Sequence, residues 1–177
     1  MKKNKNHGWC IIIEGLSGSG KTSISKKILT PIYKKIGKTI FLDGDAVREF
    51  LLSIKFKMGY KKRDRGNGAR PVSKLINIFL ENNINIIYAN VGLNKIATRV
   101  WKKNFQNLIY IYLKTNIKDI VNFGKKDLYK KIKKDIVGLD IKPDINKKAN
   151  IIISNNFDQS ISLLSKQIIK KISKIIF

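Results

Sequence analysis

The stretch that decides the fold reads Gly15-Leu16-Ser17-Gly18-Ser19-Gly20-Lys21-Thr22. It matches the pattern G-x-x-x-x-G-K-[ST], in which glycines let several backbone N–H groups curl around phosphate oxygens at the positive end of a helix. An apolar run, Trp9–Glu14, precedes it, and helical spacing over Thr22–Ile36 follows it. Strand, loop and helix are therefore expected in the order that a phosphate-binding loop requires.

A bound triphosphate needs a point charge and a metal ion as well as backbone donors. Lys21 is expected to neutralise the β- and γ-phosphates, and Thr22 is expected to offer its hydroxyl to Mg²⁺. The loop as a whole, from Gly15 to Thr22, is the expected binding site of ATP. ATP and Mg²⁺ are thus the predicted cofactors.

Outside this loop, short runs rich in Ile, Tyr and Phe alternate with segments of helical spacing. Continuous apolar runs suit strands that are buried on both faces of a parallel sheet. This alternation predicts an α/β fold, a P-loop NTPase three-layer arrangement with a mostly parallel sheet of about five strands flanked by helices. A length of 177 residues and 43% hydrophobic content favour one domain spanning residues 1–177. The expected strands are Trp9–Glu14, Thr39–Leu42, Ile84–Ala89, Leu108–Leu113 and Ile151–Ser154, and the clearest helices are Thr22–Ile36, Ser73–Leu80 and Ser160–Ile176.

Two stretches, Lys55–Arg70 and Phe123–Lys148, lack a sustained period and contain helix-breaking glycines. Long irregular segments in a compact domain are usually functional, and in a kinase they would be lids over the substrate. Both are predicted to be such loops.

Two carboxylates follow the expected strand Thr39–Leu42, with Gly44 between them allowing a sharp turn. Asp43 and Asp45 are placed to organise Mg²⁺ beside the phosphate loop. The alternative is that both are ordinary turn and helix-cap aspartates.

The net charge of +25 comes from 37 basic and 12 acidic residues, but only five of the basic residues are arginines. The lysines are spread along the chain, so solvated helix faces explain them better than a nucleic-acid site does. The arginines are more informative, because a planar bidentate donor is not replaced by lysine. Arg48, Arg65 and Arg70 stand out as candidate anion ligands, whereas Arg63 and Arg99 fit ordinary surface positions equally well.

Cysteine and histidine exclude several kinds of site. One Cys and one His cannot build an internal disulfide, a zinc site or a Cys/His nucleophile pair. The apolar run after the basic start of the chain is too short for a signal peptide or a membrane span. A cytoplasmic protein without a membrane partner is expected.

Beyond the loop, Leu42-Asp43-Gly44-Asp45-Ala46-Val47-Arg48, Gly59-Tyr60 and Asp64-Arg65 resemble the adenylylsulfate (APS) kinase family. Similarity continues at Lys126-Asp127-Leu128-Tyr129 and Gly138-Leu139-Asp140. The resemblance implies a Mg²⁺-dependent phosphotransferase that moves the γ-phosphate of ATP to the 3′-hydroxyl of adenosine 5′-phosphosulfate in sulfate activation. It also implies a homodimer.

Carried over by position, the resemblance assigns five residues to the acceptor. Asp45 and Arg48 would contact the nucleotide substrate, with Asp45 orienting or deprotonating the attacking hydroxyl. Arg65 and Arg70 would grip its anionic part, and Tyr60 would stack on its base.

The chain also departs from the family pattern in its acceptor half. Where the family has Asn-Ile-Arg-Arg, this chain has Gly68-Ala69-Arg70-Pro71. Where the family has Ile-Ser-Pro-Tyr, this chain has Gly92-Leu93-Asn94-Lys95, and Ile136 replaces the second aromatic residue that clamps the base. A changed acceptor, such as cytidine diphosphoramidate used in surface-polysaccharide modification, is therefore an alternative to APS. A nucleotide-binding protein without turnover remains the third.

Overall fold

The computed structural model describes residues 7–123, 129 and 135–177. Five parallel strands form one sheet in the order β2-β3-β1-β4-β5, so the strand that leads into the phosphate loop is central. Cys10 on β1 pairs with Ile86 on β3 and with Leu108 on β4. The strands are β1 Cys10–Gly15, β2 Thr39–Asp43, β3 Asn85–Asn90, β4 Leu108–Lys114 and β5 Ile151–Ser154.

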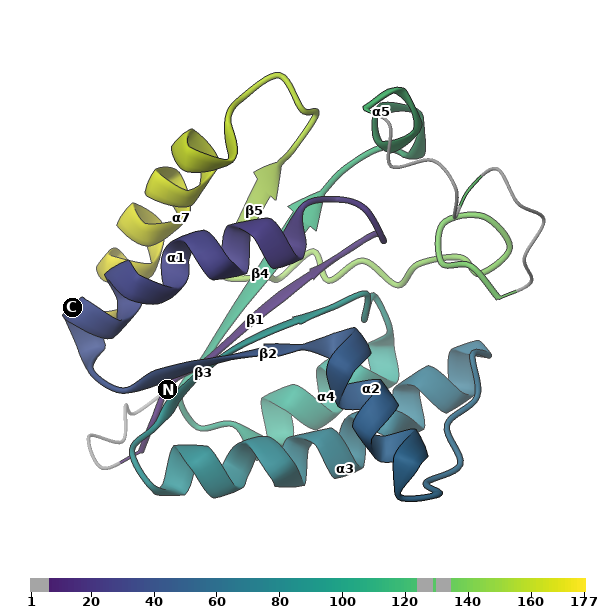
Figure 1. The fold of residues 1–177 in the computed structure, drawn as a ribbon, viewed down its shortest axis with the longest axis horizontal. Helices are drawn as coiled ribbons and strands as arrows, with labels where there is room; N and C mark the ends of the chain where they lie inside the picture. Colours follow the sequence, from purple (N-terminus) through teal and green to yellow (C-terminus); the bar gives the residue numbers. More distant parts are fainter. Residues whose placement is uncertain (1–6, 124–128, 130–134) are drawn as a thin grey trace.

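Helices cover both faces of the sheet, which confirms the expected three-layer α/β fold (Figure 1). Helices α1 and α7 pack side by side on one face, where Ile11 and Ile13 of β1 meet isoleucines of both helices. Helices α3 and α4 pack together on the other face around Trp101 and Phe105. The described helices are α1 Lys21–Ile36, α2 Gly44–Ser53, α3 Lys62–Glu81, α4 Lys95–Asn104, α5 Ile117–Asn122 and α7 Ile161–Ile176.

The prediction of a loop over Lys55–Arg70 was partly wrong. Within Lys55–Arg70, everything from Lys62 onward belongs to α3, and the expected helix Ser73–Leu80 is only the later part of it. Two of the glycines that suggested a loop lie buried in this helix: a Cβ on Gly66 would be 2.8 Å from Ile96 Cβ, and one on Gly68 would be 2.3 Å from Met58 Cε. Tertiary packing, not turn formation, explains glycine at position 66, whereas at position 68 the nearest atom is the end of the flexible Met58 side chain, which can shift.

The second predicted loop, Phe123–Lys148, falls partly outside the described residues, as do Lys126-Asp127-Leu128. Its later part is irregular, with a short bridge between Val137 and Ile141. Within the described ranges, no helix combines the length and the apolar character needed to span a bilayer.

Candidate active site

The phosphate loop joins β1 to α1 at the carboxyl edge of the sheet. Its turn places Gly18 at φ 76° and Gly20 at φ 96°, a left-handed region that favours glycine. Gly15 lies so close to β4 that a Cβ would be 2.7 Å from Leu113 O. The strand–loop–helix order expected from the sequence is confirmed.

Lys21 is the first residue of α1 and is buried, with 8% of its surface exposed. Its Nζ donates to Leu16 O at 2.7 Å, so the loop itself holds the ammonium. Burial lowers the pKa of Lys21 to about 8, and the nearby Asp45, Asp43 and Glu14 carboxylates oppose that shift. The ammonium is therefore poorly solvated, and an anionic ligand should stabilise its charged form strongly.

Asp43 and Thr22 meet as predicted. Thr22 Oγ1 donates to Asp43 Oδ2 at 2.8 Å, and Asp43 Oδ1 accepts from Asp45 N at 3.0 Å. Asp43 thus caps α2, which was the alternative expected for it, and it also contacts the phosphate loop through Thr22, while its role toward Mg²⁺ stays a prediction. Gly44 is the first residue of α2 and not part of a separate turn. It must be small because a Cβ there would lie 2.7 Å from Ala89 O.

These oxygens fit the donor set of Mg²⁺, which takes few protein ligands and completes its shell with water and phosphate oxygens. Among the described residues, no group of three or more His, Cys, Asp or Glu could hold a metal without such help. Thr22 and Asp43 are the residues that would contact the ion.

Two anchors of the phosphate loop were missed by the sequence reasoning. Asn155, directly after β5, donates from Nδ2 to Ser19 O at 2.8 Å, and the Tyr129 hydroxyl donates to Ser17 O at 2.9 Å. An asparagine directly after the last strand was the available signal for Asn155, because the carboxyl ends of parallel strands share an edge. For Tyr129 the signal was its place in the segment Lys126-Asp127-Leu128-Tyr129 that resembles the family.

Two cavities adjoin at this edge. The first, of about 230 Å³, lies over the phosphate loop, and the second, of about 80 Å³, lies between α2, α3 and α4. Asp45, Asn90 and Val91 line both. A group held in the second cavity would therefore meet a phosphate held in the first beside the Asp45 carboxylate.

Arg48 and Arg65 line the second cavity together with Asp45. Arg48 Nη2 donates to Met58 O at 2.6 Å, and Arg65 donates from Nε to Tyr60 O at 2.7 Å and from Nη2 to Asp135 O at 2.9 Å. The Arg48 guanidinium also lies 3.8 Å from the centroid of the Tyr60 ring. Both arginines therefore hold the segment before α3 over the cavity, and Arg65 joins it to the 135–141 turn.

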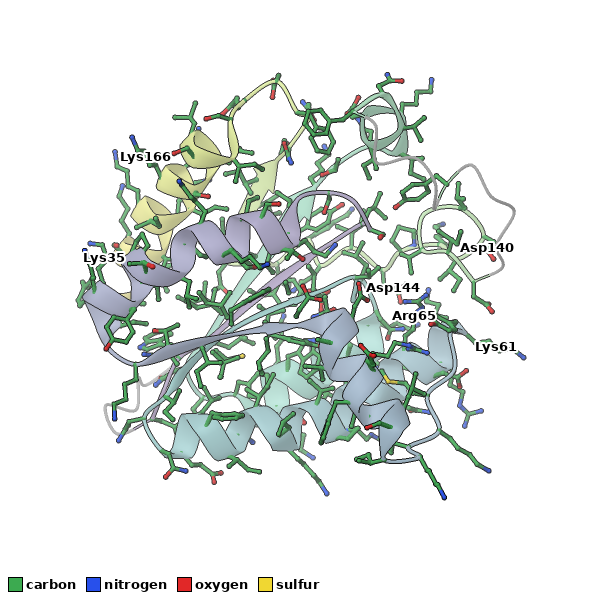
Figure 2. All side chains as sticks on the ribbon, in the orientation of Figure 1. Lys35, Lys61, Arg65, Asp140, Asp144 and Lys166 are labelled. Atoms are coloured by element: carbon green, nitrogen blue, oxygen red, sulfur yellow. The ribbon has the colours of Figure 1, made fainter. Side chains whose placement is uncertain are left out.

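Figure 2 shows Asp140, Arg65 and Lys61 toward the right of the molecule, Asp144 nearer its middle, and Lys35 and Lys166 at the left. Asp140 accepts hydrogen bonds from the backbone N–H groups of Asp135 and Ile136, which shapes the turn that Arg65 contacts. These backbone donors lower the pKa of Asp140. The labelled lysines lie at both ends, in keeping with scattered charge.

Three predicted acceptor residues do not line the two cavities. Tyr60 is 56% exposed beneath the Arg48 guanidinium, Arg70 is exposed on α3, and Ile136 is buried with 7% of its surface exposed. Their spacing in the sequence carried no information on which way each side chain would face.

The comparisons with known proteins agree with this geometry. The family model described as adenylylsulphate kinase matches residues 7–154. A cytidine diphosphoramidate kinase of Campylobacter jejuni is 27% identical over 93% of this chain and 98% of its own length. An adenylyl-sulfate kinase of Clostridium kluyveri is 28% identical over 86% of this chain and 77% of its own length.

Solved structures show the same fold. The Mycobacterium tuberculosis APS kinase in complex with AMPPNP and APS superposes with a TM-score of 0.80 at 21% identity, covering 94% of this chain and 98% of that one. With a family model matching most of its length, this chain belongs to the adenylylsulphate kinase family.

Proposed function

We propose that this chain is an ATP-dependent kinase that transfers the γ-phosphate to a hydroxyl group of a nucleotide-linked acceptor. The observation that carries the proposal is the meeting of two cavities at Asp45, one over the phosphate loop and one lined by Arg48 and Arg65. Phosphoryl transfer depends mainly on positioning and charge, and this arrangement supplies both.

On the donor side, the loop amides and Lys21 would bind the β- and γ-phosphates, and the Lys21 ammonium would exchange its bond to Leu16 O for phosphate oxygens. Thr22 and Asp43 would hold Mg²⁺, which when bound neutralises charge that develops on the phosphates. Asn155 would keep the loop in its curled shape through Ser19 O.

On the acceptor side, Asp45 would orient the attacking hydroxyl and accept its proton. Arg48 and Arg65 would release backbone carbonyls and bind the anionic part of the acceptor. A cavity of about 80 Å³ is smaller than the roughly 300 Å³ of the smallest usual ligand pockets, so the Met58–Tyr60 segment must move aside first.

A pyrimidine-linked acceptor such as cytidine diphosphoramidate is favoured. Arg48 covers a face of Tyr60, and Ile136 lies outside both cavities, so the described residues form no paired aromatic clamp for a purine. The Campylobacter jejuni relative also matches this chain over nearly its full length.

Adenosine 5′-phosphosulfate is the second candidate. The Clostridium kluyveri relative is an adenylyl-sulfate kinase of similar identity, and the Asp43-Gly44-Asp45 segment with Arg48 is present at the site.

The test is a transfer assay with ATP, Mg²⁺ and each acceptor in turn, following phosphorylated product by ³¹P NMR. We expect product from cytidine diphosphoramidate at a kcat/KM at least about tenfold above that for APS, a difference of about 1.4 kcal/mol. The reverse order would make APS the acceptor, and no product from either would overturn the proposed acceptor class.

Two variants show whether the phosphate loop produces the signal. Lys21→Ala should lose at least about 100-fold in kcat/KM, because a donor aimed at developing charge is removed. Lys26→Ala, exposed on the same helix, should match the wild type. Equal activity in both variants would show that the loop is not the site of transfer.

A further inference from the structure

Glu14 is a buried carboxylate to which the proposed mechanism gives no role. It lies at the end of β1, next to the phosphate loop, and none of its surface is exposed. Burial raises its pKa, and its hydrogen-bond donors oppose that shift. Burying a carboxyl group costs free energy unless hydrogen-bond partners compensate, so the partners of Glu14 indicate what it does.

Three donors from separate parts of the chain converge on Glu14. Oε2 accepts from Leu93 N at 2.8 Å and from the Tyr110 hydroxyl, and Oε1 accepts from Trp101 Nε1 at 3.2 Å. One carboxylate thus ties β1 to β4, to α4 and to the segment between β3 and α4.

Two of those connections lead directly to the wall of the acceptor cavity. Trp101 lines that cavity, and Gly92, which also lines it, precedes Leu93. Gly92 adopts φ 36°, and a Cβ there would lie 2.0 Å from Glu14 Cδ. The carboxylate therefore fills the space behind Gly92 while it orients the indole ring.

We propose that Glu14 is a positioning residue that sets the wall of the acceptor cavity, through Trp101 and the Gly92–Leu93 backbone, and thereby tunes acceptor affinity. The inference rests on the proposed function for the identity of the cavity. The phosphate cavity shares only Asp45, Asn90 and Val91 with the acceptor cavity. Glu14 reaches the phosphate loop only through the charge it places near Lys21, so ATP binding should change less than acceptor binding.

The kinetic test uses Glu14→Gln, which is similar in shape but replaces one acceptor oxygen with a donor. We expect the KM for the acceptor to rise roughly tenfold to 100-fold, and the KM for ATP to rise clearly less, since only the charge near Lys21 changes there. An equal rise in both constants, or in neither, would overturn the proposal.

Asn85→Ala provides the matched control. Asn85 is equally buried, at 3% exposed, and contacts Trp9 N, Ile36 O and Lys38 O at the opposite end of β3. Its loss should lower the melting temperature without altering the KM for the acceptor. If Asn85→Ala raises that KM as much as Glu14→Gln does, the effect is one of general stability.

A second measurement needs no acceptor and no turnover. The chain has two tryptophans, so the indole N–H resonances of Trp9 and Trp101 can be assigned with Trp101→Phe. In Glu14→Gln, and to a smaller extent in Tyr110→Phe, only the Trp101 resonance should move. If neither acceptor is phosphorylated but that resonance moves, the proposed function fails while the link from Glu14 to Trp101 stands. An unmoved Trp101 resonance would overturn that link directly.

Discussion

The buried ammonium of Lys21 makes nucleotide binding depend on pH. Its pKa of about 8 means that the group loses its proton as the pH rises through 8, and the neutral amine no longer attracts phosphate. We expect the Kd for ATP to be constant below pH 8 and to rise up to about tenfold per pH unit above it. Calorimetric titration at a series of pH values measures this.

Lys21→Arg supplies the control for that profile, since a guanidinium remains charged throughout. Binding by this variant, even if weak, should be flat across the same range. A wild-type profile that is equally flat up to pH 10 would mean that Lys21 keeps its proton, and that the loop solvates the ammonium better than its burial indicates.

Asp45 is expected to act on the acceptor rather than on ATP. Asp45→Asn should lower kcat roughly 100-fold or more, the contribution of a positioned proton acceptor, while the Kd for ATP changes little. Glu49→Gln, exposed one turn later on α2, is the matched control and should leave both constants unchanged. Proportional loss of ATP binding in Asp45→Asn would assign Asp45 to the nucleotide site.

At the scale of elements, a substitution at Gly66 tests why the first part of α3 was not predicted from the sequence. Gly66→Ala should destabilise the protein by about 1–3 kcal/mol through overpacking against Ile96 and Asn94, although alanine favours helix by about 1 kcal/mol. Asn67→Ala, exposed on the next position of the same helix, should instead change stability by less than about 0.5 kcal/mol. Urea unfolding compares them, and a Gly66→Ala variant as stable as Asn67→Ala would contradict the packing explanation.

The strands were predictable because each is a continuous apolar run, and all five were placed within one residue of their observed ends. The proximity of Thr22 to Asp43 was also predictable, since parallel strands end at one sheet edge; only β3 separates β2, which ends at Asp43, from β1, which leads into the phosphate loop. The start of α3 was not predictable, because Gly66 inside a helix is explained only by its close contacts with Ile96 and Asn94.

The same limit applies to the site. The sequence pattern predicted only that Glu14 ends an apolar strand. Nothing in the neighbouring sequence indicated that Leu93, Trp101 and Tyr110 would donate hydrogen bonds to it. Contacts between positions that are 79 to 96 residues apart arise from topology, which a local pattern does not report.

At the scale of the whole molecule, the charge of +25 should make stability depend on salt. Within the described residues, Lys62 with Asp144 is the one ion pair, so most of the positive charge has no close partner there. Adding salt from ~0.01 M to ~0.15 M shortens the screening length from about 30 Å to about 8 Å, which weakens repulsion among the lysines. We expect the melting temperature to rise over this range.

Anion binding at the phosphate loop would also raise the melting temperature, so the two causes must be separated. Chloride salts of several cations should act alike if screening is the cause, and Lys21→Ala should show the same increase as the wild type, because it removes one charge of many. Sulfate should stabilise the wild type beyond its effect on ionic strength, but not Lys21→Ala, since a helix N-terminus with its lysine binds such anions specifically. A chloride effect that disappears in Lys21→Ala would place the salt dependence at the phosphate loop and not in the distributed charge.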